Sequence, residues 1–137
     1  MSITGGCLCG AVRWAYDGPV NWTAHCHCES CRRNCAAPVT TYVGVPREAF
    51  RWTGVEAGVY NSSPGVRRHF CGTCGTPVAF DADHYAHEIH LYAAGHDDPE
   101  ALVPQVHVFA TEALSWLHIE DGLRRFPASG NSGGIGA

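Results

Sequence analysis

Lysine is absent from this 137-residue chain, so all nine basic residues are arginines, and the formal net charge is −4. An acidic chain without a basic stretch is a poor general binder of nucleic acid, whose phosphates need clustered positive charge. No apolar run approaches the roughly 20 residues that cross a bilayer. The start Met1–Ile3 also lacks the pattern of a signal peptide. We therefore expect a cytoplasmic protein with neither a membrane nor a nucleic-acid partner.

Long amphipathic helices are also missing, and the pattern is that of a mainly β protein. Val12, Trp14 and Tyr16 alternate with Arg13 and Ala15, which is the period of a half-buried strand. Short apolar runs separated by turn residues continue along the chain, and only two segments suit a helical turn or two: Pro99–Leu102 and Glu112–Trp116. The length suits one core. We predict an all-β domain over residues 1–127 and, from its Ser, Gly and Asn content, a flexible tail over 128–137. The large aromatic side chains are assigned to the core, with one or two of them walling a pocket: Trp14, Trp52, Trp116 and Tyr42.

Eight cysteines indicate metal binding rather than disulfides. Nothing marks the chain as secreted. Seven of the cysteines are separated from a neighbouring cysteine by only one or two residues, a spacing that rarely permits a mutual disulfide but suits two thiolates on one ion. These seven are Cys7, Cys9, Cys26, Cys28, Cys31, Cys71 and Cys74.

The cysteine spacing predicts two metal sites of different kinds. The distant pairs Cys7/Cys9 and Cys71/Cys74 close one tetrahedral four-thiolate site. The segment His25-Cys26-His27-Cys28-Glu29-Ser30-Cys31 then supplies three thiolates, and three protein ligands with a vacant fourth position are typical of a working zinc site. The spacing leaves open whether Cys35, His25 or His27 fills that position.

Three motifs, in chain order, carry a resemblance to a known family: Gly6-Cys7-x-Cys9-Gly10, Cys26-His27-Cys28-x-x-Cys31-Arg32-Arg33 and Phe70-Cys71-x-x-Cys74-Gly75-Thr76. Together with Pro104-x-x-His107-Val108-Phe109 and Trp116-x-x-x-x-Asp121-Gly122, they resemble the glutathione-dependent formaldehyde-activating enzyme family, which also includes centromere protein V. The resemblance covers Gly5 to Phe126. It implies several coiled antiparallel sheets and two zinc ions. The structural zinc would be held by Cys7, Cys9, Cys71 and Cys74, and the catalytic zinc by Cys26, Cys28 and Cys31.

The resemblance further implies a carbon–sulfur lyase that reversibly adds glutathione, or a similar thiol, to a small aldehyde such as formaldehyde. Arginine pairs suit the two carboxylates of glutathione, and Arg32-Arg33, next to Cys31, is the pair that we assign to substrate binding. The sequence does not choose the proton carrier among His27, Glu29, Ser30 and His69. It also leaves the oligomeric state open.

Two other functions compete with the lyase. One is a non-catalytic zinc module that binds a protein or nucleic acid, although no basic extension supports it. The other is a redox or metal-sensing pair made by Cys31 and Cys35.

Overall fold

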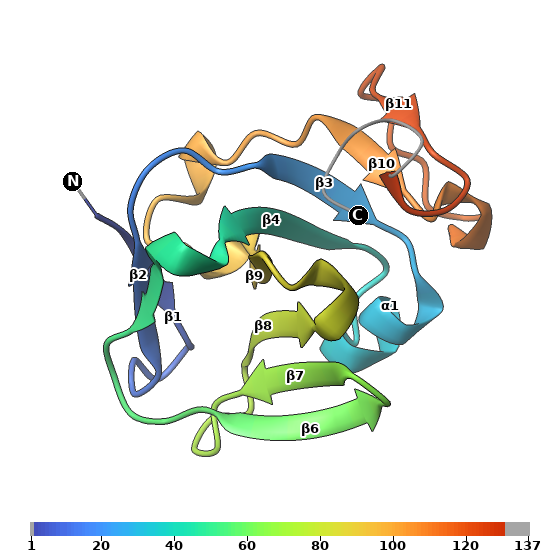
Figure 1. The fold of residues 1–137 in the computed structure, drawn as a ribbon. Coiled ribbons are helices and arrows are strands. Elements are labelled where there is room, and N and C mark those ends of the chain that lie inside the picture. Colours follow the sequence, from blue (N-terminus) through green and yellow to red (C-terminus); the bar gives the residue numbers. More distant parts are fainter. Residues whose placement is uncertain (1, 131–137) are drawn as a thin grey trace.

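A strongly curled sheet of eight strands forms most of the computed structural model, which describes residues 2–130 (Figure 1). Its strand order is β11-β10-β3-β4-β9-β8-β7-β6, and a smaller sheet has the order β1-β2-β5. The mainly β prediction is confirmed. The strands are β1 (Ile3–Gly6), β2 (Arg13–Tyr16), β3 (Trp22–Cys26), β4 (Thr40–Pro46), β5 (Phe50–Trp52), β6 (Gly58–Ser63), β7 (Val66–Phe70), β8 (Pro77–Ala82), β9 (Glu88–Tyr92), β10 (Val106–Val108) and β11 (Arg124–Arg125).

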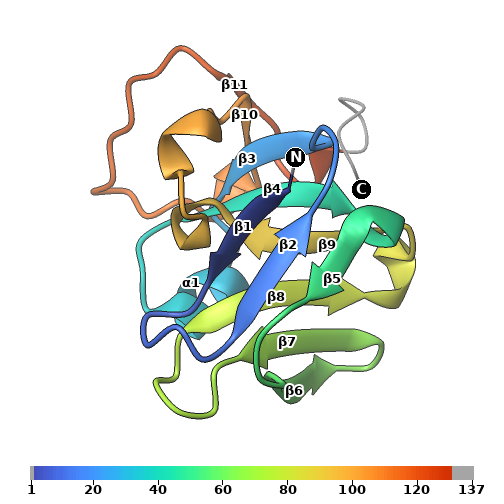
Figure 2. The ribbon, with the colours of Figure 1, turned by 90° about the vertical axis from the view of Figure 1, so that its left-hand side faces the viewer.

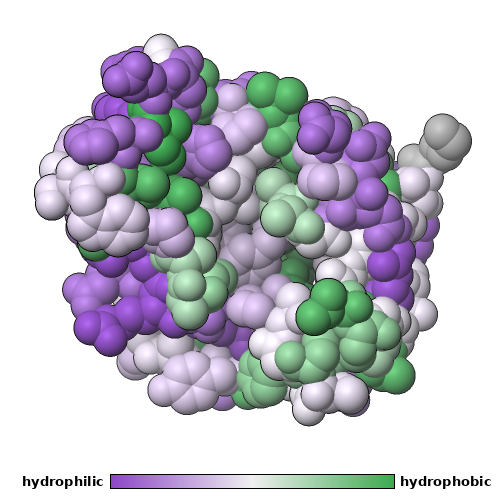
Figure 3. Space-filling model, turned by 180° about the vertical axis from the view of Figure 1, so that it is seen from behind, coloured by the Kyte–Doolittle hydropathy of each residue, from purple (hydrophilic) through white to green (hydrophobic). Residues whose placement is uncertain are grey.

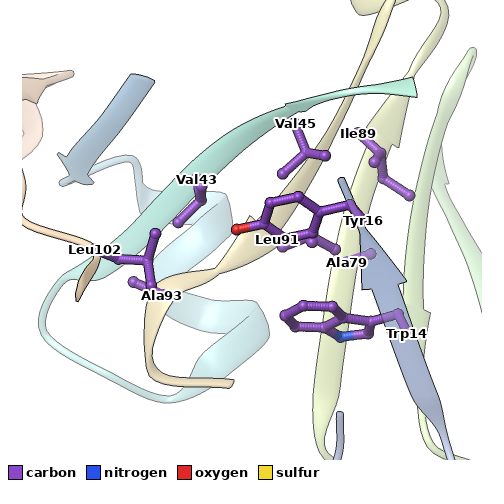
Figure 4. Close-up of a cluster of buried hydrophobic side chains, with 9 residues drawn as sticks. All are labelled: Trp14, Tyr16, Val43, Val45, Ala79, Ile89, Leu91, Ala93 and Leu102. Atoms are coloured by element: carbon purple, nitrogen blue, oxygen red, sulfur yellow. The ribbon is translucent and has the colours of Figure 1, made fainter. Parts of the chain in front are cut away.

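The small sheet crosses one face of the large sheet, and the main core lies between the two (Figure 2). Trp14 and Tyr16, which the alternating pattern assigned to one face of a strand, project from β2 toward Val43 and Leu91 (Figure 4). All four side chains are buried. Alternation along β2 therefore determines which face of this strand closes the core.

Parallel pairing of β10 with β3 and β11 organises the C-terminal part of the chain. The other strand pairs of both sheets are antiparallel within the described residues. The register places His107 beside His25, and Val108 beside Cys26. A segment about 80 positions later in the sequence thus flanks the cysteine-rich one.

Helix α1 (Glu29–Cys35) is the element that the sequence did not predict. Its seven residues are too few for an apolar period to emerge. It begins directly after Cys28, and Ala36 ends it in the left-handed conformation (φ +51°), donating its N–H to the carbonyls of Arg32 and Arg33. Single 3-10 turns complete the described helical structure: Arg47–Ala49, Asp83–Tyr85, Ala93–Gly95, Pro99–Ala101 and Ala110–Glu112.

The prediction that the large aromatic side chains lie in the core is only partly right. Trp14 and Tyr42 are buried, but Trp52 is 38% exposed and Trp116 is 65% exposed, so these two are not core residues. Apolar and polar residues are interspersed over the back of the molecule, with one larger apolar area at the lower right of Figure 3. None of the helices between residues 2 and 130 has the length and apolar character needed to cross a membrane.

The buried carboxylate of Asp81 joins β8 to two arginines and makes stability depend on pH. Arg67 binds it through two nitrogens, at 3.0 and 3.1 Å, and Arg47 also donates to it. Burial alone would raise the pKa of Asp81, but the hydrogen bonds and charges of Arg67 and Arg47 outweigh this and lower the pKa to about 2. Since the pKa in the unfolded chain is about 3.9, the stabilisation is present above that pH and is lost as the pH falls from about 4 to 2.

We expect Asp81→Asn to lower the free energy of unfolding by about 2–3 kcal/mol at pH 7, and the difference from wild type to shrink toward pH 3. Urea unfolding at several pH values measures this. Asp83→Asn is the matched control, because Asp83 pairs with the same Arg67 at 3.0 Å but is exposed, so its loss should cost less than about 1 kcal/mol. If Asp81→Asn lowers the free energy of unfolding equally at pH 7 and pH 3, the stabilisation does not depend on the ionisation of Asp81.

Candidate metal centres and cavity

Four thiols from two distant turns converge beside β1 and β7. The Sγ atoms of Cys7 and Cys9 are 3.6 Å apart, and those of Cys9 and Cys71 are 3.8 Å apart. The ligand atoms of these three residues and Cys74 all lie within 4.8 Å of one another. A tetrahedral zinc ion with Zn–S bonds of about 2.3 Å requires S···S separations of about 3.8 Å. The donor set and spacing therefore fit zinc.

Backbone N–H groups surround the same sulfurs. Val12 N–H donates to the Sγ of Cys7 at 3.3 Å, and the N–H groups of Thr73 and Cys74 donate to that of Cys71 at 3.4 Å. A hydrogen bond from Thr76 lowers the pKa of the Cys74 thiol to about 5. Such donors stabilise thiolates, the form that binds metal.

The second group of thiols lies where β3 meets α1. Cys26 ends β3, Cys28 immediately precedes the helix, and Cys31 is in its first turn, one helical turn from Cys28. All three line a cavity of about 230 Å³. They are not among the described groups whose ligand atoms all lie within 4.8 Å of one another, so this set is looser than the four-thiol cluster.

The three thiols nevertheless interact strongly. Hydrogen bonding with Cys26 and then Cys31 lowers the pKa of Cys28 far below its usual range, and the same contacts raise that of Cys26. Contact with the other two thiols therefore favours the thiolate form of Cys28. Three such sulfurs around one opening are a suitable donor set for zinc.

Arg68 is the arginine that reaches this cavity. Its two terminal nitrogens lie 3.8 and 4.0 Å from the Sγ of Cys31, and its guanidinium stacks over Phe80 with 5.1 Å between the guanidinium carbon and the ring centroid. Although charged, the residue is buried. Cys31 also contacts the hydroxyl of Tyr42, which lies 3.3 Å from that of Tyr92. The cavity therefore has one fixed cation beside its thiols.

Half of the other residues that line the cavity are aromatic or histidine. His90 is one of these residues; it stacks on Phe80, and its Nε2 lies 3.1 Å from the carboxylate of Glu88. Phe109 adopts a left-handed conformation (φ +51°), which bulky residues rarely use. Its N–H bonds the carbonyl of Ala128, and two further residues of the predicted tail, Ser129 and Gly130, line the cavity. The rest of that tail, residues 131–137, lies outside the described residues. The complete set of aromatic and histidine lining residues is Trp22, Tyr42, Phe80, His84, Tyr85, His90 and Phe109.

The residues that compete for the fourth ligand position are engaged elsewhere. Cys35 does not line the cavity, and Asn34 and Tyr92 contact its thiol. His27 is buried, with its Nε2 2.8 Å from the Nδ1 of His107. Burial lowers the pKa of His27 to about 4, so its ring is neutral near pH 7. His25 hydrogen-bonds Thr41 at 2.8 Å.

The arginine pair that the sequence assigned to substrate lies outside the cavity wall. Arg32 donates to the carbonyls of His27 and Glu112, and Arg33 forms an exposed ion pair with Glu29. The substrate-binding role of Arg32 and Arg33 stays a prediction. Nothing local in the sequence distinguishes Arg68, because it reaches Cys31 only through the packing of β7 near α1, 37 positions away in the chain.

A family model and two similar proteins relate this chain to formaldehyde-activating enzymes and lyases. A family model described as glutathione-dependent formaldehyde-activating enzyme matches residues 2–112. An uncharacterized lyase of Schizosaccharomyces pombe is 32% identical over 76 residues, which is 56% of this chain and 55% of that protein, so the chain matches about half the length of this relative. A Halomonas elongata protein named "Putative glutathione-dependent formaldehyde-activating enzyme" is 26% identical over 133 residues, covering 88% of this chain and 82% of that protein.

A solved structure agrees with the fold. The crystal structure of a Rhodobacter sphaeroides protein has a TM-score of 0.58 and 18% identity, and the match covers 90% of this chain and 98% of that one. This likeness supports the architecture of the sheets.

Proposed function

The chain belongs to the glutathione-dependent formaldehyde-activating enzyme family, and from this premise we propose that it is a zinc-dependent carbon–sulfur lyase. Its reaction would be the reversible addition of a thiol, glutathione or a close analogue, to a small aldehyde such as formaldehyde. The observation that carries the proposal is the cavity lined by three interacting thiols with a buried arginine beside them.

Two zinc ions per chain are part of this proposal. Cys7, Cys9, Cys71 and Cys74 would hold a structural ion. Cys26, Cys28 and Cys31 would hold the ion at the cavity. When bound there, zinc lowers the pKa of a thiol ligand and so supplies a nucleophilic thiolate near neutral pH.

The reaction balances without an oxidant or a reductant. The thiol sulfur forms a bond to the aldehyde carbon, the carbonyl π electrons move to oxygen, and the proton lost by the thiol ends on that oxygen. The reverse reaction breaks the C–S bond. The cavity contributes apolar and aromatic walls around the thiols, beside which the charge of Arg68 acts more strongly than in bulk water.

Side chains of the protein would supply the remaining positive charge and the proton carrier. Arg68 places a permanent positive charge at the thiols, suited to an anionic sulfur or to a carboxylate of the substrate. Of the four proton carriers left open by the sequence, only Ser30 lines the cavity. His27 contacts His107, Glu29 pairs with Arg33, and His69 lies near Asp81.

The cobalt-substituted protein tests the proposed function. Its thiolate-to-cobalt absorption bands are expected to grow saturably when glutathione is added, because a further sulfur enters the ion's ligand set at the cavity. If cobalt fills two thiolate sites and glutathione changes neither band position nor intensity, the cavity ion is closed to thiols. The non-catalytic zinc module then becomes the better description.

Replacing Arg68 tests the cavity's positive charge. We expect Arg68→Met, which keeps the apolar contact with Phe80, to lower kcat/KM for glutathione by about tenfold to a hundredfold through the loss of a charge-assisted contact. Steady-state kinetics with glutathione and formaldehyde measure this. Arg51→Met is the matched control, since Arg51 is exposed and pairs with Asp17 away from the cavity. If the two variants have equal kcat/KM values, the charge of Arg68 does not contribute to the binding of glutathione.

A further inference from the structure

Two imidazoles and a carboxylate converge at a place that is separate from both thiol clusters. Ligand atoms of His25, His107 and Asp121 all lie within 4.8 Å of one another. Pairing in register of the parallel strands β3 and β10, adjacent in Figure 1, puts the two rings side by side with centroids 4.9 Å apart. Asp121, which precedes β11, brings its Oδ2 to 2.7 Å from the Nε2 of His107. None of the three residues lines the cavity described above.

Each of the three side chains is also oriented through its other polar atom. The Nδ1 of His25 lies 2.8 Å from the hydroxyl of Thr41, and the Nδ1 of His107 lies 2.8 Å from the Nε2 of His27. The Oδ1 of Asp121 accepts the N–H of Leu123 at 3.0 Å. In protein metal sites, ligating histidines and carboxylates are held by outer hydrogen bonds of this kind. The Nε2 of His107 and the Oδ2 of Asp121 are hydrogen-bonded to each other, so an ion bound by these two atoms and by His25 would replace the proton that they share.

We propose that His25, His107 and Asp121 form a third, cysteine-free site for a divalent transition ion such as zinc, nickel or cobalt. Two neutral imidazoles and one carboxylate suit ions of borderline softness, and three protein ligands leave room for water. His107 is fully buried, whereas the side chain of Asp121 is 25% exposed, so the ion enters from the Asp121 side. The residue beside His107 on β11 is Arg125, whose positive charge opposes the ion. This site therefore binds more weakly than either thiolate site.

Titrating protein that holds two equivalents of zinc per chain with cobalt(II) tests this site, because a cysteine-free site has its own optical signature. Wild type is expected to take up one further equivalent of cobalt. The new bands should be weak visible bands without the intense near-ultraviolet absorption of thiolate-bound cobalt. In His25→Ala and in Asp121→Ala, affinity for this equivalent should fall by about tenfold or more, as one of three protein ligands is lost.

Matched controls separate the site from general histidine and carboxylate binding. His87→Ala and Asp98→Ala change exposed residues outside the cluster and should bind cobalt as wild type does. Arg125→Gln should bind it severalfold more tightly, because the repulsion of the cation is removed. Retention of the zinc content of wild type shows that each variant keeps its thiolate sites. Asp121→Ala decides the question if His25→Ala does not fold.

The proposal is overturned if zinc-loaded wild type takes up no further cobalt, or if the added cobalt shows thiolate absorption. It is also overturned if His25→Ala and Asp121→Ala bind the extra ion as wild type does. The three residues would then serve only to hold the strands β3 and β10 together.

Discussion

Cys31→Ser is expected to remove one of two bound zinc ions and nearly all catalytic activity. The thiol of Cys31 lines the cavity, interacts with those of Cys26 and Cys28, and lies next to Arg68. Serine has a harder, far less acidic donor atom, so the remaining two sulfurs would hold zinc poorly. We expect the rate of thiol addition to formaldehyde to fall by about a hundredfold or more. Metal content from plasma mass spectrometry and the exchange rate from NMR of mixed glutathione and formaldehyde measure the two effects.

Cys35→Ser is the control that decides between an open and a closed site. Cys35 lies at the end of the same helix, but its neighbours are Asn34 and Tyr92 rather than the cavity. The Cys35→Ser variant should keep both zinc ions and an activity close to that of wild type. Loss of one zinc ion in this variant, with Cys31→Ser unchanged, would mean that Cys35 ligates the second ion and that our assignment of the cavity thiols is wrong.

Cys71→Ser should have the largest effect on stability. Cys71 is fully buried, and its sulfur accepts two backbone N–H groups and lies 3.8 Å from that of Cys9. The four-thiol cluster ties the turn after β1 to the turn after β7, segments more than 60 residues apart in the sequence. Loss of a structural zinc ion that stabilises the folded state should lower the midpoint of thermal unfolding by about 10–20 °C.

The comparison with Cys31→Ser makes this result specific. Both variants are expected to lose one zinc ion, but Cys31→Ser should lose activity with a small change in thermal stability, whereas Cys71→Ser should lose stability first. Calorimetry of both variants, alongside their metal content, measures the difference. If the two variants unfold at the same temperature, the structural and catalytic roles are not divided between the clusters in the way that we propose.

Cysteine spacing was sufficient to predict the four-thiol cluster. Cys7 and Cys9, like Cys71 and Cys74, are close neighbours in the chain, and a chelating pair needs one partner pair to complete a tetrahedron. The fold brings the ligand atoms of these four residues within 4.8 Å of one another. The alternating pattern of Trp14 and Tyr16 likewise predicted the inward face of β2, because side-chain direction in a strand follows from position alone.

Short and non-local features were beyond prediction. Helix α1 has seven residues, so no helical period could appear in the sequence, yet it spaces Cys28 and Cys31 on one face. Trp52 and Trp116 are as apolar as Trp14 but lie on the surface, because the number of large apolar residues exceeds what the two sheets can cover.

The sequence by itself determined the thiol inventory in two spacings, a mainly β architecture and a resemblance that the family match bears out. Only the tertiary structure decided which residues surround those thiols. Arg68 reaches Cys31 across 37 positions, and His107 reaches His27 across 80. Contacts of this kind depend on strand order and register, which are set by the packing of the whole sheet rather than by any local pattern.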